Sequence, residues 1–201
     1  MYRIYGALIE IAAAAVFVIP LFCLYNKLCF HDWKRTVLYT VFGFYLTALL
    51  ALVGFPSVTS LKTDFTVNMI PFAYMASDFV NACLNVLLFI PFGFFLPILW
   101  SPFRSLKKAA LTGLITTLLI EISQIFTYRT TDINDIITNT FGTIAGYFIA
   151  RRITGKFTKR ILSDSKTSDC SLICGTVGAV MFFFQPFISG LLWEKVLQFL
   201  P

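Results

Sequence analysis

Residues 121–146 read EISQIFTYRTTDINDIITNTFGTIAG, and they gather polar side chains in a chain that is otherwise rich in Leu, Ile, Val and Phe. The polar residues of this stretch are Glu121, Gln124, Arg129, Asp132, Asp135 and Asn139. Because polar and ionisable groups are costly inside a membrane, such a run in an apolar chain indicates a place where they serve a purpose. We expect the rest of the chain to be the scaffold that holds this stretch in position.

The composition predicts a membrane protein. The chain has 201 residues, of which 58% are hydrophobic and 13% charged, and its mean hydropathy is +0.81. Soluble domains carry about 25% charged residues. At about 20 residues per crossing, the length accommodates five or six helices and no separate soluble domain. The fold class we predict is therefore all-α, a polytopic helix bundle that forms a single membrane domain over residues 1–201.

Six apolar runs are expected to cross the membrane. They are residues 6–25, 36–55, 82–100, 109–127, 133–150 and 171–193. A version with five spans, in which the first run is lost or re-entrant, is the alternative. Residues 56–80 are too polar to cross and too aromatic to stay in water, which predicts an outer amphipathic segment between the second and third helices. Pro91, Gly93 and Pro97 predict a bend or a packing notch in the third run.

The positions of the cations predict the topology and exclude nucleic acid as a partner, although the net charge is +6. Twelve of the 16 Lys and Arg residues follow the first, third and fifth apolar runs. By the positive-inside rule, both termini are expected outside. Residues 151–162 alternate apolar and basic side chains, which predicts contact with anionic lipid. The alternative is that these charges only set the orientation.

The polar stretch is expected to form the turn of a helical hairpin. A single helix over residues 109–150 would be about 63 Å long, roughly twice the thickness of the hydrocarbon core. The chain must therefore turn back, and we place the turn near Thr130 on the outer side. Gly142 and Gly146 form a G-x-x-x-G pattern, which predicts that the following helix approaches another helix closely.

Each arm of this hairpin carries one polar stripe, because its polar residues are spaced by three and four. The stripes are Glu121, Gln124 and Tyr128 on the first arm and Asp132, Asp135 and Asn139 on the second. A turn at Thr130 places Gln124 level with Asp135, and Glu121 level with Asn139. Asn68 and Asn85 are expected at the same depth.

Two interpretations of these stripes remain open. In the first, the polar groups hydrogen-bond to one another and only pin the hairpin, each interhelical bond contributing about 0.6 kcal/mol. In the second, they form a site, in which Arg129 neutralises Asp132 and Asp135 or binds a phosphate or carboxylate. Two carboxylates beside an arginine are weak evidence for a cation, so we expect no metal and no cofactor.

The remaining titratable side chains exclude several classes of enzyme. His31 is the only histidine and lies in a basic linker, which argues against Ser-His triads and zinc hydrolases within one chain. The five cysteines form no C-x-x-C pair and are interpreted as free or packing residues.

Five motifs occur in order and resemble the VanZ-like family over roughly residues 40–150. They are NMIPF (68–72), NVLLFIPFGFFLP (85–97), IEISQ (120–124), RTTDINDIITNTFG (129–142) and the pair Gly146-Tyr147. The matching polar positions are Asn68, Asn85, Glu121, Gln124, Arg129, Asp132, Asp135 and Asn139. The family is named for a bacterial protein that raises resistance to the glycopeptide teicoplanin. The resemblance implies a multi-pass protein of the bacterial cytoplasmic membrane with a role at the cell envelope, and it assigns no reaction.

The function we expect first is non-enzymatic: an outward-facing polar cavity binds a membrane lipid, a cell-wall precursor or an amphiphilic drug and thereby affects glycopeptide susceptibility. One alternative is a membrane enzyme that uses Glu121 or Asp135 as general base, with Arg129 holding a phosphate of a lipid-linked substrate. The other is a proton-coupled carrier in which Glu121 titrates. The sequence leaves the oligomeric state open.

Overall fold

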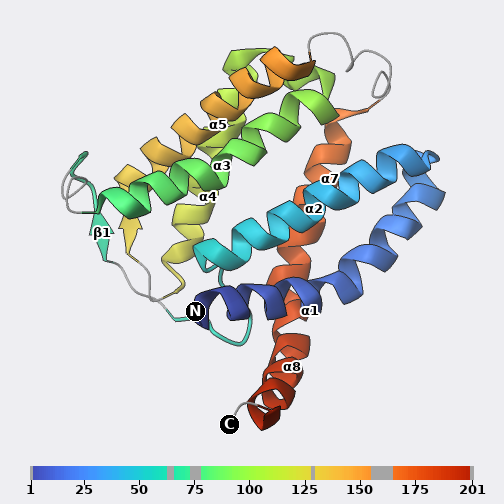
Figure 1. The fold of residues 1–201 in the computed structure, drawn as a ribbon, viewed down its shortest axis with the longest axis vertical. Coiled ribbons are helices and arrows are strands. Elements are labelled where there is room, and N and C mark those ends of the chain that lie inside the picture. Colours follow the sequence, from blue (N-terminus) through green and yellow to red (C-terminus); the bar gives the residue numbers. More distant parts are fainter. Residues whose placement is uncertain (1, 63–65, 73–77, 128–129, 155–164, 200–201) are drawn as a thin grey trace. The chain divides into compact units, whose positions relative to one another are not determined.

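The computed structural model describes residues 2–62, 66–72, 78–127, 130–154 and 165–199. These residues are almost entirely helical, which confirms the all-α fold class. The chain divides into two compact units, one formed by Met1–Leu61 with Ser168–Pro201 and the other by Lys62–Thr167 (Figure 1). The prediction of a single membrane domain stays a prediction.

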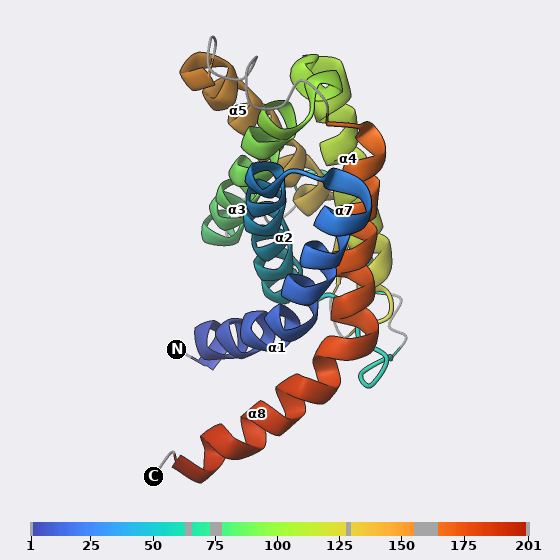
Figure 2. The same ribbon diagram turned by 90° about the vertical axis from the view of Figure 1, so that its right-hand side faces the viewer.

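The first unit is built from four long helices and two short π-helical turns. They are α1 (Tyr2–Tyr25), a π-turn (Asn26–Phe30), α2 (Trp33–Val53), α7 (Thr167–Ala179), a second π-turn (Val180–Phe184) and α8 (Gln185–Phe199). Helix α1 packs against α2 and α8. The Tyr39 hydroxyl donates to Asp169 Oδ2 at 3.1 Å and so ties α2 to α7. Figure 2 shows α7 continuing through the second π-turn into α8.

The second unit contains the polar stretch, and its described residues are built around three helices. They are α3 (Phe79–Leu99), α4 (Leu106–Gln124) and α5 (Ile133–Thr154), with a 3-10 turn (Ser101–Arg104) between α3 and α4. Two short strands, β1 (Val67–Asn68) and β2 (Thr131–Asp132), pair in parallel, with Asn68 opposite Asp132. Helix α5 packs most extensively against α3 and next against α4. Figure 1 shows α3 and α5 running alongside each other.

Glycines allow α3 and α5 to touch through their backbones. A Cβ at Gly142 would overlap the carbonyl oxygen of Val86, and a Cβ at Gly146 would overlap that of Ile90. From the other side, a Cβ at Gly93 would overlap the carbonyl oxygen of Thr143. The close approach expected from the G-x-x-x-G pattern is therefore confirmed, and Gly93 forms the packing notch expected in the third run.

Four of the described helices are long and apolar enough to cross a membrane. They are Tyr5–Phe30, Trp33–Val53, Phe79–Leu99 and Thr167–Lys195. These correspond to the first, second, third and sixth predicted spans. The fourth and fifth predicted runs also form helices, α4 and α5, but they lie outside this group. Helix α4 carries Lys107, Lys108 and Glu121, and α5 carries several Asn, Asp, Thr and Arg side chains, which make both helices more polar. That α4 and α5 cross the membrane stays a prediction.

The glycine contact yields a stability prediction. Gly142→Ala or Gly146→Ala is expected to lower the free energy of unfolding in detergent micelles by about 1–3 kcal/mol, because the added methyl group overlaps a carbonyl of α3. The matched control is Gly178→Ala in α7, where an added Cβ has no atom within 4 Å and alanine favours the helix. Equal stability of the Gly146→Ala and Gly178→Ala variants would contradict the assignment.

Candidate functional site

The hairpin exists, but its register differs from the one predicted. Helix α4 ends at Gln124 and α5 begins at Ile133, so the turn is centred before Thr130. As a result, Glu121 lies level with Asp132, whereas we expected it level with Asn139. The predicted register is wrong because it requires both helices to continue to the tip of the hairpin, whereas residues 125–127 form turns and β2 precedes α5.

The polar stripe predicted that Asp132 lies within the fifth helix, which is wrong: Asp132 directly precedes α5. Its Oδ1 accepts the backbone N–H of Asn134 at 2.8 Å, as a side chain does when it caps a helix N-terminus. Asp135 lies in the first turn of the same helix. Both carboxylates are half-buried, and both lie where the helix dipole favours negative charge. The local fold thus offsets part of the cost of placing two acids here.

Glu121 is the buried acid of the site, with 2% of its side chain exposed. Its Oε2 accepts the backbone N–H of Asp132 at 2.9 Å, and its backbone carbonyl accepts the Thr131 hydroxyl at 3.1 Å. The carboxylate therefore ties the last turns of α4 to β2 and to the start of α5. Glu121 does not lie against open surface.

Two asparagines bring further elements to the same place. The Asn68 amide donates to both carboxylate oxygens of Asp132 at 3.2 Å, which joins β1 to the start of α5. The Asn85 amide donates to Asp135 Oδ1 at 2.8 Å, which joins α3 to α5. We call the resulting set the polar cluster: Asn68, Asn85, Glu121, Asp132, Asn134 and Asp135. It unites residues that are up to 67 positions apart in the chain, since it reaches from Asn68 to Asp135.

The remaining predicted site residues are Asn139, Gln124 and Arg129. Asn139 is buried one turn deeper, where its amide donates to the Thr117 hydroxyl at 2.9 Å and joins α5 to α4. Gln124 is buried at the end of α4. Arg129, like Tyr128, lies outside the described residues, so its proposed pairing with Asp132 and Asp135 stays a prediction.

Sequence reasoning missed two residues that complete the arrangement. Asn134 is buried and its Oδ1 accepts the backbone N–H of Phe72 at 2.7 Å, which holds the chain after β1. Thr117 is the partner of Asn139 and lies one turn before Glu121 on the same face of α4. Because Thr117 lies four residues before Glu121, the spacing could have extended the first polar stripe inward to Thr117. Nothing in the sequence indicated that Asn134 accepts the backbone N–H of Phe72.

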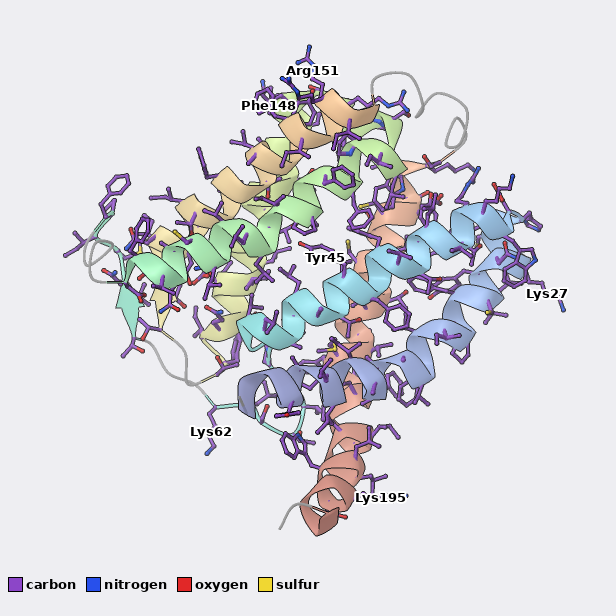
Figure 3. All side chains as sticks on the ribbon, viewed as in Figure 1. Lys27, Tyr45, Lys62, Phe148, Arg151 and Lys195 are labelled. Atoms are coloured by element: carbon purple, nitrogen blue, oxygen red, sulfur yellow. The ribbon has the colours of Figure 1, made fainter. Side chains whose placement is uncertain are left out.

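The opposite end of the second unit is basic. The 3-10 turn and the start of α4 expose Arg104, Lys107 and Lys108, and the end of α5 exposes Arg151 and Arg152. The Tyr147 hydroxyl donates to the Arg104 carbonyl at 2.6 Å, so these two basic groups lie at one end. Figure 3 shows Phe148 and Arg151 together near the end of α5. Each long helix of the unit therefore runs between a basic end and the polar cluster.

The described residues contain no group of three or more His, Cys, Asp and Glu side chains that could hold a metal ion. The hydrogen bonds of the polar cluster described above join carboxylates to amide and backbone donors. Such an arrangement can hold helices together and can accept hydrogen bonds from a ligand with hydroxyl or amino groups.

Comparison with known proteins identifies the family. The VanZ/LLP1 family model matches residues 42–154, which is more than half of the chain and includes every residue of the polar cluster. The chain belongs to the VanZ/LLP1 family. Protein VanZ of Enterococcus faecium is 36% identical over 108 residues, which cover 51% of this chain and 66% of that protein. No solved structure matches. This VanZ-family chain is thus a membrane protein by family and by its apolar helices.

The position of Glu121 yields a second stability prediction. Glu121→Leu is expected to lower the free energy of unfolding by about 1–3 kcal/mol, because the Asp132 N–H loses its acceptor. Glu121→Gln is the matched variant, since its amide oxygen can still accept that N–H. Thermal or denaturant unfolding of both variants in the same detergent checks the difference. A Glu121→Leu protein at least as stable as Glu121→Gln would show that this bond does not hold the hairpin.

Proposed function

We propose that this VanZ-family protein acts at the bacterial cell envelope, where the polar cluster faces outward and binds the polar headgroup of a membrane lipid or lipid-linked cell-wall precursor. Occupation of this site changes the access of glycopeptides such as teicoplanin to the cell surface. The observation that carries the proposal is the presence of three acids, Glu121, Asp132 and Asp135, at the same end of an apolar helical unit.

The outward orientation is supported by the distribution of charge. Arg104, Lys107, Lys108, Arg151 and Arg152 lie at the end of the second unit opposite to the cluster. Lys and Arg are enriched on the cytoplasmic side of membrane proteins. With the basic end in the cytoplasm, the polar cluster lies toward the exterior, where wall precursors and glycopeptides meet.

The chemistry of the cluster favours a ligand with donor groups. Asn68 and Asn85 direct their amide donors to Asp132 and Asp135, so carboxylate oxygens supply most of the hydrogen-bond acceptors of the cluster. An ionised carboxylate accepts hydrogen bonds at about four lone-pair positions, so it can serve a structural donor and a ligand donor together. Sugar hydroxyls and amino groups fit such a surface better than a phosphate does. A phosphate would need Arg129 as its partner.

The enzymatic and carrier alternatives make different demands on Glu121. A general base or a titrating group must exchange a proton with substrate or water. The contact of Glu121 with the Asp132 N–H and its burial favour a positioning role, which is why binding is the function proposed first.

Charge-neutralising substitutions test the proposal. In cells that depend on this protein for reduced teicoplanin susceptibility, Asp135→Asn is expected to return the inhibitory concentration to that of cells without the protein. Asparagine keeps the size of the side chain but removes the charge and half of its acceptor capacity. The measurement is the inhibitory concentration at matched protein levels in the membrane.

The matched control is Asp78→Asn, because Asp78 is an exposed acid that accepts a hydrogen bond from the Asn81 amide and is not a member of the polar cluster. This variant is expected to keep the wild-type susceptibility. The proposal fails if Asp132→Asn and Asp135→Asn both fold and both retain full protection. Loss of protection in Glu121→Gln, with Asp135→Asn unaffected, would favour proton chemistry instead.

A further inference from the structure

The segment from β1 to Phe72 exposes a run of large apolar side chains. The exposed fractions are 46% for Val67, 69% for Met69, 67% for Ile70 and 65% for Phe72. Asn68, the one polar residue among them, turns the other way and donates to Asp132. We call residues 67–72 the apolar loop. Contiguous apolar side chains of this size mark a surface that meets another apolar phase.

This exposure is built into the fold, because the backbone of the apolar loop is held by one hydrogen bond within the loop, by one to α5 and by the pairing of β1 with β2. The Ile70 N–H donates to Asn68 Oδ1 at 3.3 Å, and the Phe72 N–H donates to Asn134 Oδ1 at 2.7 Å. Phe72 has a φ of 60°, a left-handed conformation that is uncommon for an aromatic residue. Contacts that hold a residue in such a conformation fix where its side chain points.

The apolar loop lies near the start of a helix that is long and apolar enough to span the membrane. Helix α3 exposes Phe79, Val80, Leu84 and Leu87 by 54–70%. The loop and the start of α3 meet neighbouring residues of α5, because Phe72 contacts Asn134 and Asn85 contacts Asp135. In Figure 1, β1 lies at the end of the unit where α3 begins.

We propose that the apolar loop lies in the membrane interface and that Met69, Ile70 and Phe72 insert among the lipid acyl chains. The occupant of this surface is the bilayer itself, because α3 presents its own apolar side chains to the same phase. Aromatic and aliphatic side chains anchor other proteins at this depth in the same way. The insertion places Asn68 and the polar cluster at the level of the lipid headgroups. It requires only that α3 crosses the membrane, and it holds whether or not the cluster binds a ligand.

Spin labels measure this depth directly. The full chain, with its five native cysteines replaced, receives a nitroxide at Ile70→Cys and is reconstituted in vesicles of phosphatidylethanolamine and phosphatidylglycerol. We expect the label to collide readily with oxygen and to be protected from a water-soluble nickel chelate. Leu84→Cys on α3 is the lipid-facing reference, and Thr130→Cys, an exposed polar position beside β2, is the water-facing reference.

Two results would overturn the proposal. An Ile70→Cys label as accessible to the nickel chelate as the Thr130→Cys label would place the apolar loop in water. A label protected from both oxygen and nickel would mean that protein covers the loop. Met69→Cys repeats the measurement at a second position, so one variant that does not fold cannot decide the outcome.

Discussion

The backbone contact between α3 and α5 is the constraint on which the second unit depends. Gly142 and Gly146 bring α5 against the carbonyls of Val86 and Ile90, and Gly93 lets α3 approach Thr143 in return. In lipid, helices gain little from burying apolar surface, so close packing and interhelical hydrogen bonds hold them together. This contact sets the spacing at which Asn85 can reach Asp135.

The polar cluster follows from that spacing and from the helix that begins there. Asp132 and Asp135 lie at the N-terminus of α5, where the aligned peptide dipoles favour anions. Glu121 lies near the C-terminal end of α4, where the helix dipole does not favour an anion, and the backbone N–H of Asp132 stabilises its carboxylate instead. The three acids are therefore stabilised in an apolar protein by hydrogen-bond donors from β2, β1 and α3: the Asp132 N–H and the amides of Asn68 and Asn85. Together the three acids place a set of hydrogen-bond acceptors at one end of the second unit.

The sequence predicted the helices and most members of the site, for physical reasons that can be named. Long apolar runs predict where the helices lie. The G-x-x-x-G pattern predicts a close helix contact, and Gly142 and Gly146 make that contact with α3. The spacing of polar residues along α5 correctly predicted that Asp135 belongs to the polar cluster. It could not predict which residues of the two hairpin arms lie at the same level. That register depends on where α4 ends. The pairing of β1 with β2 places Asn68 opposite Asp132 and so provides the amide that donates to the Asp132 carboxylate. Asn134 was missed because its partner is the backbone of Phe72, and backbone groups carry no sequence signal.

The most direct test of the account is whether α3 delivers Asn85 to Asp135 in the membrane. Asn85→Cys and Asp135→Cys are introduced into a chain without native cysteines and treated in native membranes with the shortest bifunctional thiol reagent. The account predicts efficient intramolecular cross-linking of this pair, since the two native side chains are joined by a hydrogen bond of 2.8 Å. It also predicts little cross-linking when Leu84→Cys, one residue away on the exposed face, replaces Asn85→Cys. Equal yields for the two pairs, or none for the first, would contradict it.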